Sequence, residues 1–481
     1  MCKQRAPMHV IRRPGQARQQ NKSQNRRGEA SIFEPATKHI PALRQNGDAH
    51  TTGPIPPRII LHGGAGNITR ASLPRGAYDE YRSSLLRIVD AAARKLAEPG
   101  ATALDVATYA VALLEEDALY NSARGAVFTR GGKNELEASV MVSDGYRKKG
   151  VGCTLLTRVR NPIKLARELL VRGEEVDGGG GAGDHCFYSG EVAEGLARKW
   201  GLDMVEPSWF FTQRRWDEHL RGLEEEKEGK MAGSVGVQGT SEWEKSHYVP
   251  LGTCGAVVVD SYGTICTATS TGGLTNKVDG RVGDTPTIGA GFWAEEWYED
   301  AAAAAAAKML YQPVSQAVAP IDKLSRGDLH GALDGCLPIL GSSSSRQTAP
   351  MPSQDNKEPT PIRHAVGLSG TGNGDSFLRT SAARTTAAKS RFSSQSLSDA
   401  TTWMVGRGGE LQKSAGNRWD GVHEGVGGII GIELVGNRVQ VVQDYNCGGM
   451  FRAWTEENGS RKCLIFREDR WESGPHSWQD I

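Results

Sequence analysis

The residue in this sequence best placed to do chemistry is Thr253, which follows Gly252 and precedes an apolar, β-branched run. A threonine hydroxyl is a weak nucleophile unless a base lies beside it, and one such base is the threonine's own α-amine. A free α-amine titrates near ~7.7–8.0, whereas an amide nitrogen has no useful basicity. The amine exists only if the Gly252–Thr253 bond is cut. The pair predicts either a self-cleaved threonine hydrolase or simply a threonine that begins a strand.

The element that must position Thr253 is a predicted β-hairpin. The valine run at 257–259 stiffens an extended backbone and suits a strand that is buried on both faces. Gly263 supplies the turn to a second strand at 265–269. Thr253 is therefore expected at the start of a rigid core strand, and Cys254 as a small buried residue within it.

Other motifs accompany this hairpin in a fixed order along the chain. They are His62-Gly63-Gly64-Ala65-Gly66, Asn121 to Phe128 with Glu135-Leu136-Glu137-Ala138, Thr269 to Gly273 with Lys277, Gly280 to Pro286, Ile288 to Gly291, Gly367 to Asp375, and Gly427 to Ile430. This set resembles the isoaspartyl peptidase/L-asparaginase family, the threonine branch of the N-terminal-nucleophile hydrolases. The resemblance covers most of residues 57–300 and 362–456. It implies an α+β fold, a four-layer αββα sandwich.

The resemblance also assigns the catalytic residues. Amide hydrolysis needs a nucleophile, a proton acceptor, an anion stabiliser and a substrate grip. Thr253 would supply the first two, and Thr271 matches the family's second threonine, expected to hydrogen-bond the nucleophile. Thr371 and Gly372 suit the oxyanion site, because a hydroxyl and a backbone N–H can converge on one oxygen. Without the resemblance, Thr271 reads as a strand-end threonine and Thr371-Gly372 as an ordinary turn.

Arg281 and Asp284 are the expected substrate grip. An aspartate-type substrate has an α-carboxylate and an α-ammonium, so one fixed cation and one fixed anion recognise both. The alternative is a surface ion pair worth ~0–1 kcal/mol. Asn121 matches a family asparagine near the active site and is assigned to substrate binding.

The family has a loop beside Asn121 that binds a monovalent cation through backbone carbonyls. Ala123 and Arg124 stand where the family commonly has glycine and a variable residue. This departure puts the structural cation in doubt, and no other cofactor and no metal centre is predicted.

The composition limits the classes of binding partner that the protein is expected to have. A net charge of +1, from 57 basic and 56 acidic residues, gives no global field for nucleic acid or an acidic membrane. No run approaches the ~20 apolar residues that span a bilayer, and the N-terminus lacks the apolar core of a secretory signal. The eight cysteines are scattered without a C-x-x-C motif, which favours unpaired thiols and a cytoplasmic location. The expected partner is a small-molecule or dipeptide substrate, and the family implies a homodimer of self-cleaved α/β chains.

The chain order predicts two catalytic halves with added segments. Residues 1–56, rich in arginine and poor in acidic residues, are expected to form a basic disordered tail, with a mitochondrial presequence as the alternative. Residues 57–252 form the α-subunit half, with a linker at 224–247. Residues 253–456 form the β-subunit half, interrupted by a low-complexity insertion at 313–361, and 457–481 are an uncertain tail.

Periodicity and capping signals predict the elements around these motifs. Helices are expected at 78–97, at 103–116 with Thr102 as its cap, at 162–173 after Asn161, at 190–201, in the alanine run 301–307 and at 396–405. Strands are expected at 59–61 (running into a glycine loop), 126–129, 137–142, 151–156, 364–368, 428–435 and 439–443. A flexible glycine loop is expected at 178–181. In the helix at 190–201, Val192, Leu196 and Trp200 should share the buried face.

The resulting functional prediction is an amidohydrolase that cleaves L-asparagine and β-aspartyl (isoaspartyl) dipeptides after its own scission into 1–252 and 253–481. A related alternative is a glycosylasparaginase-like hydrolase, which shares the Gly-Arg-Val-Gly-Asp motif but usually has aspartate before its nucleophile. An alternative of another class is a non-catalytic scaffold whose chain stays unprocessed.

Overall fold

The computed structural model describes residues 53–183, 185–227, 252–299, 361–393, 395–419, 423–477 and 480. All of them fall within one compact unit, 41–481, while a separate unit, 1–40, lies outside the described residues. The predicted N-terminal tail up to residue 52, the alanine-run helix and nearly all of the predicted insertion also lie outside the described residues.

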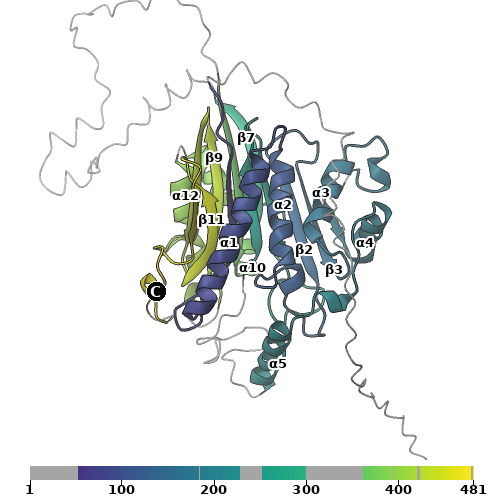
Figure 1. The fold of residues 1–481 in the computed structure, drawn as a ribbon, viewed down its shortest axis with the longest axis vertical. Coiled ribbons are helices and arrows are strands. Elements are labelled where there is room, and N and C mark those ends of the chain that lie inside the picture. Colours follow the sequence, from purple (N-terminus) through teal and green to yellow (C-terminus); the bar gives the residue numbers. More distant parts are fainter. Residues whose placement is uncertain are drawn as a thin grey trace, which may run out of the picture. The chain divides into compact units, whose positions relative to one another are not determined.

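Two antiparallel-type sheets form the centre of the described part of the chain (Figure 1). The larger has the order β12-β11-β1-β5-β6-β2-β3-β4, and its only parallel pair there is β3 with β4. Its strands are β1 (Arg58–Gly66), β2 (Leu136–Val142), β3 (Gly150–Leu156), β4 (Phe187–Ser189), β5 (Cys254–Val259), β6 (Ile265–Thr271), β11 (Gly449–Thr455) and β12 (Arg461–Leu464). The smaller has the order β10-β9-β8-β7, from β7 (Phe292–Glu299), β8 (Ile362–Gly372), β9 (Gly427–Val435) and β10 (Arg438–Tyr445).

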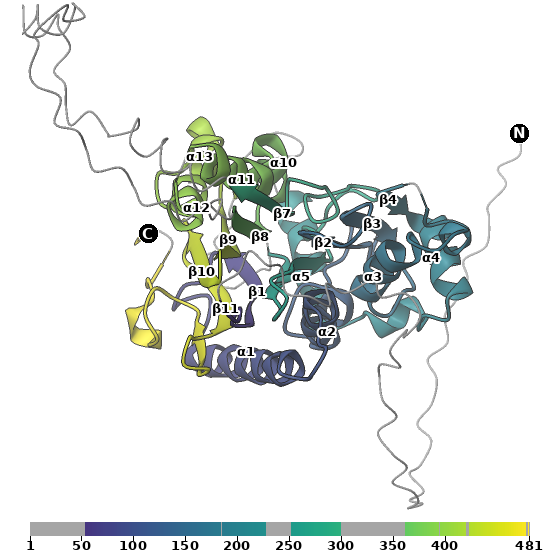
Figure 2. The same ribbon diagram turned by 90° about the horizontal axis from the view of Figure 1, so that it is seen from above.

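Alternation along the strands sends neighbouring side chains into different cores. Ile59 and Leu61 of β1 face helices on the outer side of the larger sheet, whereas Ile60 faces the smaller sheet. Those helices are α1 (Arg75–Leu96), α2 (Ala103–Glu116), α3 (Pro162–Arg172) and α4 (Gly190–Lys199). A second helical layer covers the outer face of the smaller sheet, as Figure 2 shows. It contains α10 (Gly374–Thr380), α11 (Ala382–Phe392), α12 (Leu397–Val405) and α13 (Glu410–Lys413). The layers are therefore helix, sheet, sheet, helix, and the αββα prediction is confirmed.

The hairpin around Thr253 forms as predicted. β5 and β6 are antiparallel neighbours, with Cys254 opposite Ser270 and Val259 opposite Ile265. Every residue of both strands is buried. Cys254 is fully buried, and the cysteines of the described residues are all free thiols.

Several local expectations also hold. The helix at 103–116 has the predicted bounds, and the Thr102 hydroxyl accepts a hydrogen bond from the Asp105 amide at 3.2 Å. The helix at 162–172 begins with Pro162 at its first turn, although Asn161 makes no side-chain cap. Ser396 caps α12 by accepting from the Asp399 amide.

Other expectations need correction. The glycine run after 59–61 is not a loop, because β1 continues to Gly66 across a bulge between His62 and Gly64. Residues 126–129 form no strand, and 178–180 form a short 3₁₀ turn. Val192 of α4 is exposed, whereas Leu196 and Trp200 do pack against the core, next to the buried Ala193 and Ala197.

The ends of the two predicted halves also contain structure that the sequence left undefined. Helix α5 (Gln213–Lys227) extends into the first residues of the predicted linker, whose remainder lies outside the described residues. In the predicted tail, β12 pairs with β11 and so extends the larger sheet.

Candidate active site

Thr253 lies directly before β5, almost completely buried between the two sheets' ends. Its backbone N–H donates to the Thr371 hydroxyl at 2.9 Å. Its own hydroxyl lies 3.2 Å from the hydroxyl of Thr285. Thr371 ends β8 of the smaller sheet, so the fold brings the predicted nucleophile and the predicted oxyanion group together from opposite sheets.

Gly252 is confined by the backbone of β1. A Cβ atom at this position would lie 2.5 Å from the Gly64 Cα and 2.7 Å from both the Ala65 nitrogen and the Thr371 hydroxyl. Real Cβ atoms do not approach other atoms so closely, so only glycine fits before Thr253. The glycines of β1 therefore allow close approach of the Gly252–Thr253 segment.

Asn121 holds the carbonyl of the same peptide. Its buried side-chain amide donates to the Gly252 oxygen at 3.2 Å and to the Gly273 oxygen at 2.7 Å. Its oxygen accepts from the Val127 amide at 3.1 Å, which fixes the orientation of the side chain. The sequence assigned Asn121 to substrate binding, whereas in this chain its partner is the carbonyl that precedes Thr253.

Thr271 is near Thr253 but makes a different contact from the one expected. It ends β6 one position beyond the Cys254–Ser270 pair, and its hydroxyl accepts from the Gly273 amide at 3.0 Å. The short turn after β6 draws the hydroxyl to Gly273. The hydroxyl partner of Thr253 is instead Thr285, which sequence reasoning missed although it lies beside Asp284 in the Gly280–Pro286 motif.

The predicted oxyanion turn has the backbone shape that its glycine allows. Gly372 has a φ of 140°, and a Cβ there would lie 2.3 Å from the Val426 carbonyl. Asn373 follows as the N-cap of α10, its side chain accepting from the Ser376 amide. Because Thr371 accepts from the Thr253 N–H, its own hydroxyl hydrogen remains a donor for a second group.

Arg281 and Asp284 both face the turn at the start of α10. A Cβ at Gly374 would lie 2.5 Å from an Asp284 carboxylate oxygen and 3.0 Å from the Arg281 guanidinium. Arg281 also lies 3.2 Å from the carboxylate of Asp375, to which the sequence pattern gives no role. One cation and one anion therefore lie side by side at the start of α10, three residues after Thr371.

Burial controls the charge of Asp284. Desolvation raises its pKa to about 7, and the nearby Glu137 carboxylate adds to this while Arg281 opposes it. Glu137 was quoted in a motif without a role; it accepts hydrogen bonds from the Gly283 amide at 2.9 Å and the Thr154 hydroxyl at 3.1 Å. The loop carrying Arg281 and Asp284 is thus anchored to β2.

The loop beside Asn121 keeps its turn despite its two unusual residues. Ala123 adopts the left-handed φ of 44° that glycine favours, and its carbonyl accepts from the Ala126 amide. Arg124 points to the outside of the loop, where it donates to the Trp209 and Phe211 carbonyls. Across the described residues, no group of three or more histidine, cysteine or acidic side chains could hold a metal ion.

Comparison with known proteins identifies the family. A sequence model described as Asparaginase matches residues 55–309. A putative isoaspartyl peptidase/L-asparaginase of Dictyostelium discoideum is 31% identical over 420 residues, covering 82% of this chain and 92% of that protein. The chain belongs to the asparaginase family. Its assignment as an amidohydrolase is confirmed with the family.

Two bacterial members of the family show the same relationship. An isoaspartyl peptidase of Salmonella typhimurium is 31% identical, with 85% of this chain and 98% of that protein aligned. An isoaspartyl peptidase of Escherichia coli is 40% identical over 236 residues, which cover 49% of this chain and 67% of that protein.

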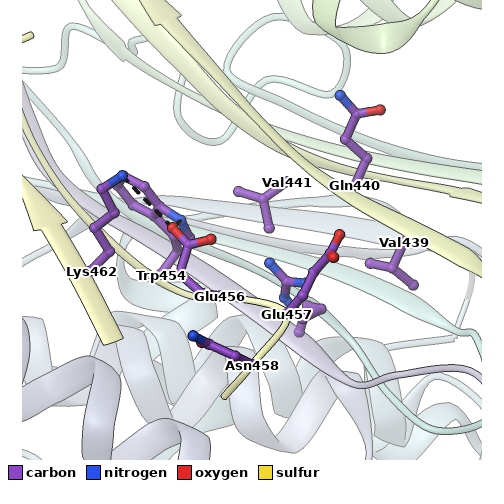
Figure 3. Close-up of a pocket in the computed structure, with 9 residues that line it drawn as sticks. Val439, Gln440, Val441, Trp454, Glu456, Glu457, Asn458 and Lys462 are labelled. Carbon is purple, nitrogen blue, oxygen red and sulfur yellow. Dashed lines mark hydrogen bonds and ion pairs between the residues drawn. The ribbon is translucent and has the colours of Figure 1, made fainter. Parts of the chain in front are cut away.

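A cleft of about 570 Å³ elsewhere on the asparaginase-family fold is not this site. It lies beside Arg58 at the start of β1, whereas Gly252 contacts the other end of that strand. Figure 3 shows its lining, with Glu456 and Lys462 gathered at Trp454. Its walls contain no threonine, serine or cysteine and no residue of the Thr253 cluster. Among the described helices, none combines the length and apolar character needed to cross a bilayer.

Proposed function

We propose that Thr253 is the nucleophile of a self-cleaving hydrolase that acts on L-asparagine and on β-aspartyl dipeptides. The observation that carries this proposal is a pair of hydrogen bonds to one peptide group, the one between Gly252 and Thr253. Asn121 donates to the Gly252 carbonyl, and Thr371 accepts from the Thr253 N–H. A buried peptide held at both its oxygen and its nitrogen, next to a hydroxyl, is a substrate for intramolecular attack.

The self-cleavage step follows from these contacts. The Thr253 hydroxyl oxygen attacks the Gly252 carbonyl carbon, and the hydroxyl proton passes to the departing nitrogen. The C–N bond breaks and an ester forms between Gly252 and the Thr253 side chain. Asn121 donates to the oxygen that becomes negatively charged, as an oxyanion donor does. Water then hydrolyses the ester, leaving a Gly252 carboxylate and a Thr253 with a free α-amine.

In the processed enzyme, the α-amine of Thr253 accepts the proton of its own hydroxyl during attack. The hydroxyl oxygen attacks the substrate's side-chain amide carbon, while Thr371 and the Gly372 N–H stabilise the oxyanion. Ammonia, or the amine of the leaving amino acid, departs with the proton. Water then hydrolyses the ester to release aspartate and restore Thr253.

Arg281 and Asp284 select the substrate in this proposal. The guanidinium pairs with the α-carboxylate, taking over from Asp375, and the Asp284 carboxylate pairs with the α-ammonium. The related proteins named isoaspartyl peptidase, or isoaspartyl peptidase/L-asparaginase, support the substrate class. Steady-state rates on L-asparagine, on a β-aspartyl dipeptide and on a glycosylated asparagine separate this class from glycosylasparaginase activity.

The deciding experiment is denaturing electrophoresis of purified protein with sequencing of the fragments. Wild type should give two fragments, one of them beginning Thr-Cys-Gly-Ala. Thr253→Ala should give a single band without amidase activity. A wild-type chain that stays intact yet hydrolyses asparagine would contradict the mechanism, and an intact inactive chain would support the scaffold alternative.

The processed protein is proposed to consist of α and β halves, 57–252 and 253–456, with two such αβ units in a homodimer. The resemblance to the family supports the dimer, and light scattering on the processed protein measures it. The free thiols at the described cysteines support a reducing, cytoplasmic compartment, which localisation of the tagged full-length chain tests.

A further inference from the structure

Helix α5 occupies an unusual place in both the sequence and the fold. It is the last described element before the segment that ends at Gly252, with residues 228–251 between them outside the described part. Figure 1 shows it beyond one end of α2, outside the helical layer formed by α1 to α4. It nevertheless contacts the two loops that carry Asn121 and Arg281.

The first contact is made by Arg215, whose side chain is completely buried. Its Nε donates to the Gly125 carbonyl at 2.9 Å and its Nη2 to the Leu119 carbonyl at 3.2 Å. Its Nη1 pairs with Glu218, one helical turn along α5, at 2.9 Å. A buried guanidinium needs such partners on every side to offset its desolvation. Arg215 thereby ties α5 to both sides of the turn that contains Asn121.

The second contact is made by His219, also buried. Its Nδ1 hydrogen-bonds the side-chain oxygen of Asn276, and the Asn276 amide group donates to the His219 carbonyl at 3.1 Å. Asn276 has a φ of 58°, so this loop residue is held in a conformation that asparagine adopts only in turns. The same loop continues from Asn276 to Arg281 and Asp284.

The two contacts are joined by an aromatic cluster. Trp216 of α5 packs edge-on against Phe128, with ring centroids 5.1 Å apart, and lies 4.9 Å from the His219 ring. The Phe128 carbonyl accepts from the Asn276 amide at 2.8 Å. The Asn121 loop, the Arg281 loop and α5 therefore form one packed unit.

We infer that α5 is a positioning element for both reactions, with a separate residue for each. Arg215 holds the Asn121 turn and so aligns the donor to the Gly252 carbonyl during self-cleavage. His219 holds the Asn276–Asp284 loop and so places Arg281 for substrate binding in the processed enzyme. The inference rests on the proposed function. If α5 only added stability, an apolar contact would serve as well as a buried ion pair.

The His219 arm is tested on processed enzyme with L-asparagine. Loss of one net hydrogen bond, about 1 kcal/mol, corresponds to about a five-fold change. His219→Ala should therefore raise KM about five-fold while kcat and the extent of self-cleavage stay at the wild-type level. His219→Asn, which keeps a polar partner for Asn276, should recover part of the loss. The control is Glu224→Ala, an exposed residue of the same helix. An unchanged KM, or an equal fall in kcat, would overturn this arm.

The Arg215 arm is tested by following self-cleavage of freshly synthesised chain over time. Removing Arg215 alone leaves Glu218 buried without its main partner, so the variant of choice is Arg215→Met with Glu218→Met. It should cleave about five-fold to about 30-fold more slowly, because the Asn121 turn loses two hydrogen bonds of about 1 kcal/mol each. Once processed, its KM should match that of wild type.

The thermal midpoints of the double variant and of Glu224→Ala are measured in the uncut Thr253→Ala background. They show whether slow cleavage comes from lost alignment of Asn121 or from a less stable fold. A double variant that cleaves at the wild-type rate refutes the role of Arg215. A wild-type chain that never cleaves would refute the proposed function instead, so the two failures are distinguishable.

Discussion

At the scale of single residues, the hydroxyl beside Thr253 is not the one that the sequence predicts. Thr285 lies 3.2 Å from the Thr253 hydroxyl, while Thr271 is turned to the Gly273 amide. Hydroxyl pairs of this kind fix a side-chain rotamer, and the rotamer decides whether the oxygen points at the carbonyl it must attack. Thr285 is fully buried, so its hydroxyl is shielded from bulk solvent.

We predict that Thr285→Val slows self-cleavage about five-fold, which is the effect of losing one net hydrogen bond of about 1 kcal/mol. Valine keeps the shape but removes the hydroxyl. The rate is measured as the disappearance of uncut chain on denaturing gels. Thr285→Ser, which retains the hydroxyl, is the matched control and should cleave at nearly the wild-type rate. Equal rates for the valine and serine variants would exclude the contact from the mechanism.

A second residue-scale prediction concerns pH. Burial raises the pKa of Asp284 to about 7, so its carboxyl group becomes protonated as the pH falls through that value. A neutral carboxyl cannot pair with the substrate's α-ammonium. KM for L-asparagine should therefore rise as the pH falls below about 7, and be lowest above it.

The check is a KM–pH profile of wild type beside that of Asp284→Asn. The variant should have a high KM at every pH and no inflection near 7. An inflection that survives in the variant would assign the titration to another group.

At the scale of elements, strand and helix signals are clearest where turn or cap residues mark the ends of a buried segment. The β5–β6 hairpin and α2 have nearly the expected bounds, because the valine run and the Gly263 turn mark the hairpin and the Thr102 cap marks the start of α2. The 59–66 segment was misread, since glycines normally interrupt strands, but here they permit close approach by Gly252 and by the Tyr120 ring. Helices α10 and α11 were missed, because their buried faces consist largely of alanine, serine and threonine.

In the site, too, some residues can be found from sequence motifs, while other contacts arise only from the fold. The Thr253 N–H donates to Thr371, and Arg281 and Asp284 both lie against Gly374 at the start of α10. Three other contacts depend on the relative placement of the two sheets and a loop. They are those of Thr285 with Thr253, of Asp375 with Arg281, and of Asn121 with the Gly252 carbonyl. No local pattern along the chain encodes those relations.

An element-scale prediction follows from Glu115 of α2, which joins three elements. Its carboxylate accepts from the Ile163 amide at the start of α3 and from the Ser270 hydroxyl of β6. Burial outweighs these hydrogen bonds and raises its pKa to about 8. The folded chain therefore keeps a proton that the unfolded chain releases near its ordinary pKa of 4.5. The free energy of unfolding contributed by Glu115 should decrease as pH rises from about 4.5 to 8.

Denaturant unfolding of the uncut Thr253→Ala chain at several pH values measures this dependence. Adding Glu115→Gln should flatten the curve across that window, since glutamine still accepts from Ile163 but does not titrate. Asp260 and Asp284 also have raised pKa values, of about 6 and 7, so the difference between the two curves is the informative quantity. Parallel curves would contradict a neutral buried Glu115.

At the scale of the whole molecule, both proposed fragments contribute strands to the larger sheet, and these strands alternate within it. β5 and β6 follow Thr253, yet β5 pairs with β1 and β6 pairs with β2, which both precede it. β11, also from the second fragment, pairs with the other edge of β1. Cutting the chain at Gly252 therefore removes one peptide bond but leaves three strand interfaces between the fragments.

We accordingly predict that fragments 1–252 and 253–481 stay associated after cleavage. They should elute together in gel filtration under native conditions and separate only in denaturant, because each would otherwise expose unpaired interior strands and the apolar core around Ile60 and Val257. Native mass measurement before and after denaturation checks this. The uncut Thr253→Ala chain is the control, and should elute at the same volume as the processed protein. Fragments that separate without denaturant would mean that the strands on the two sides of the cut are not held in one sheet.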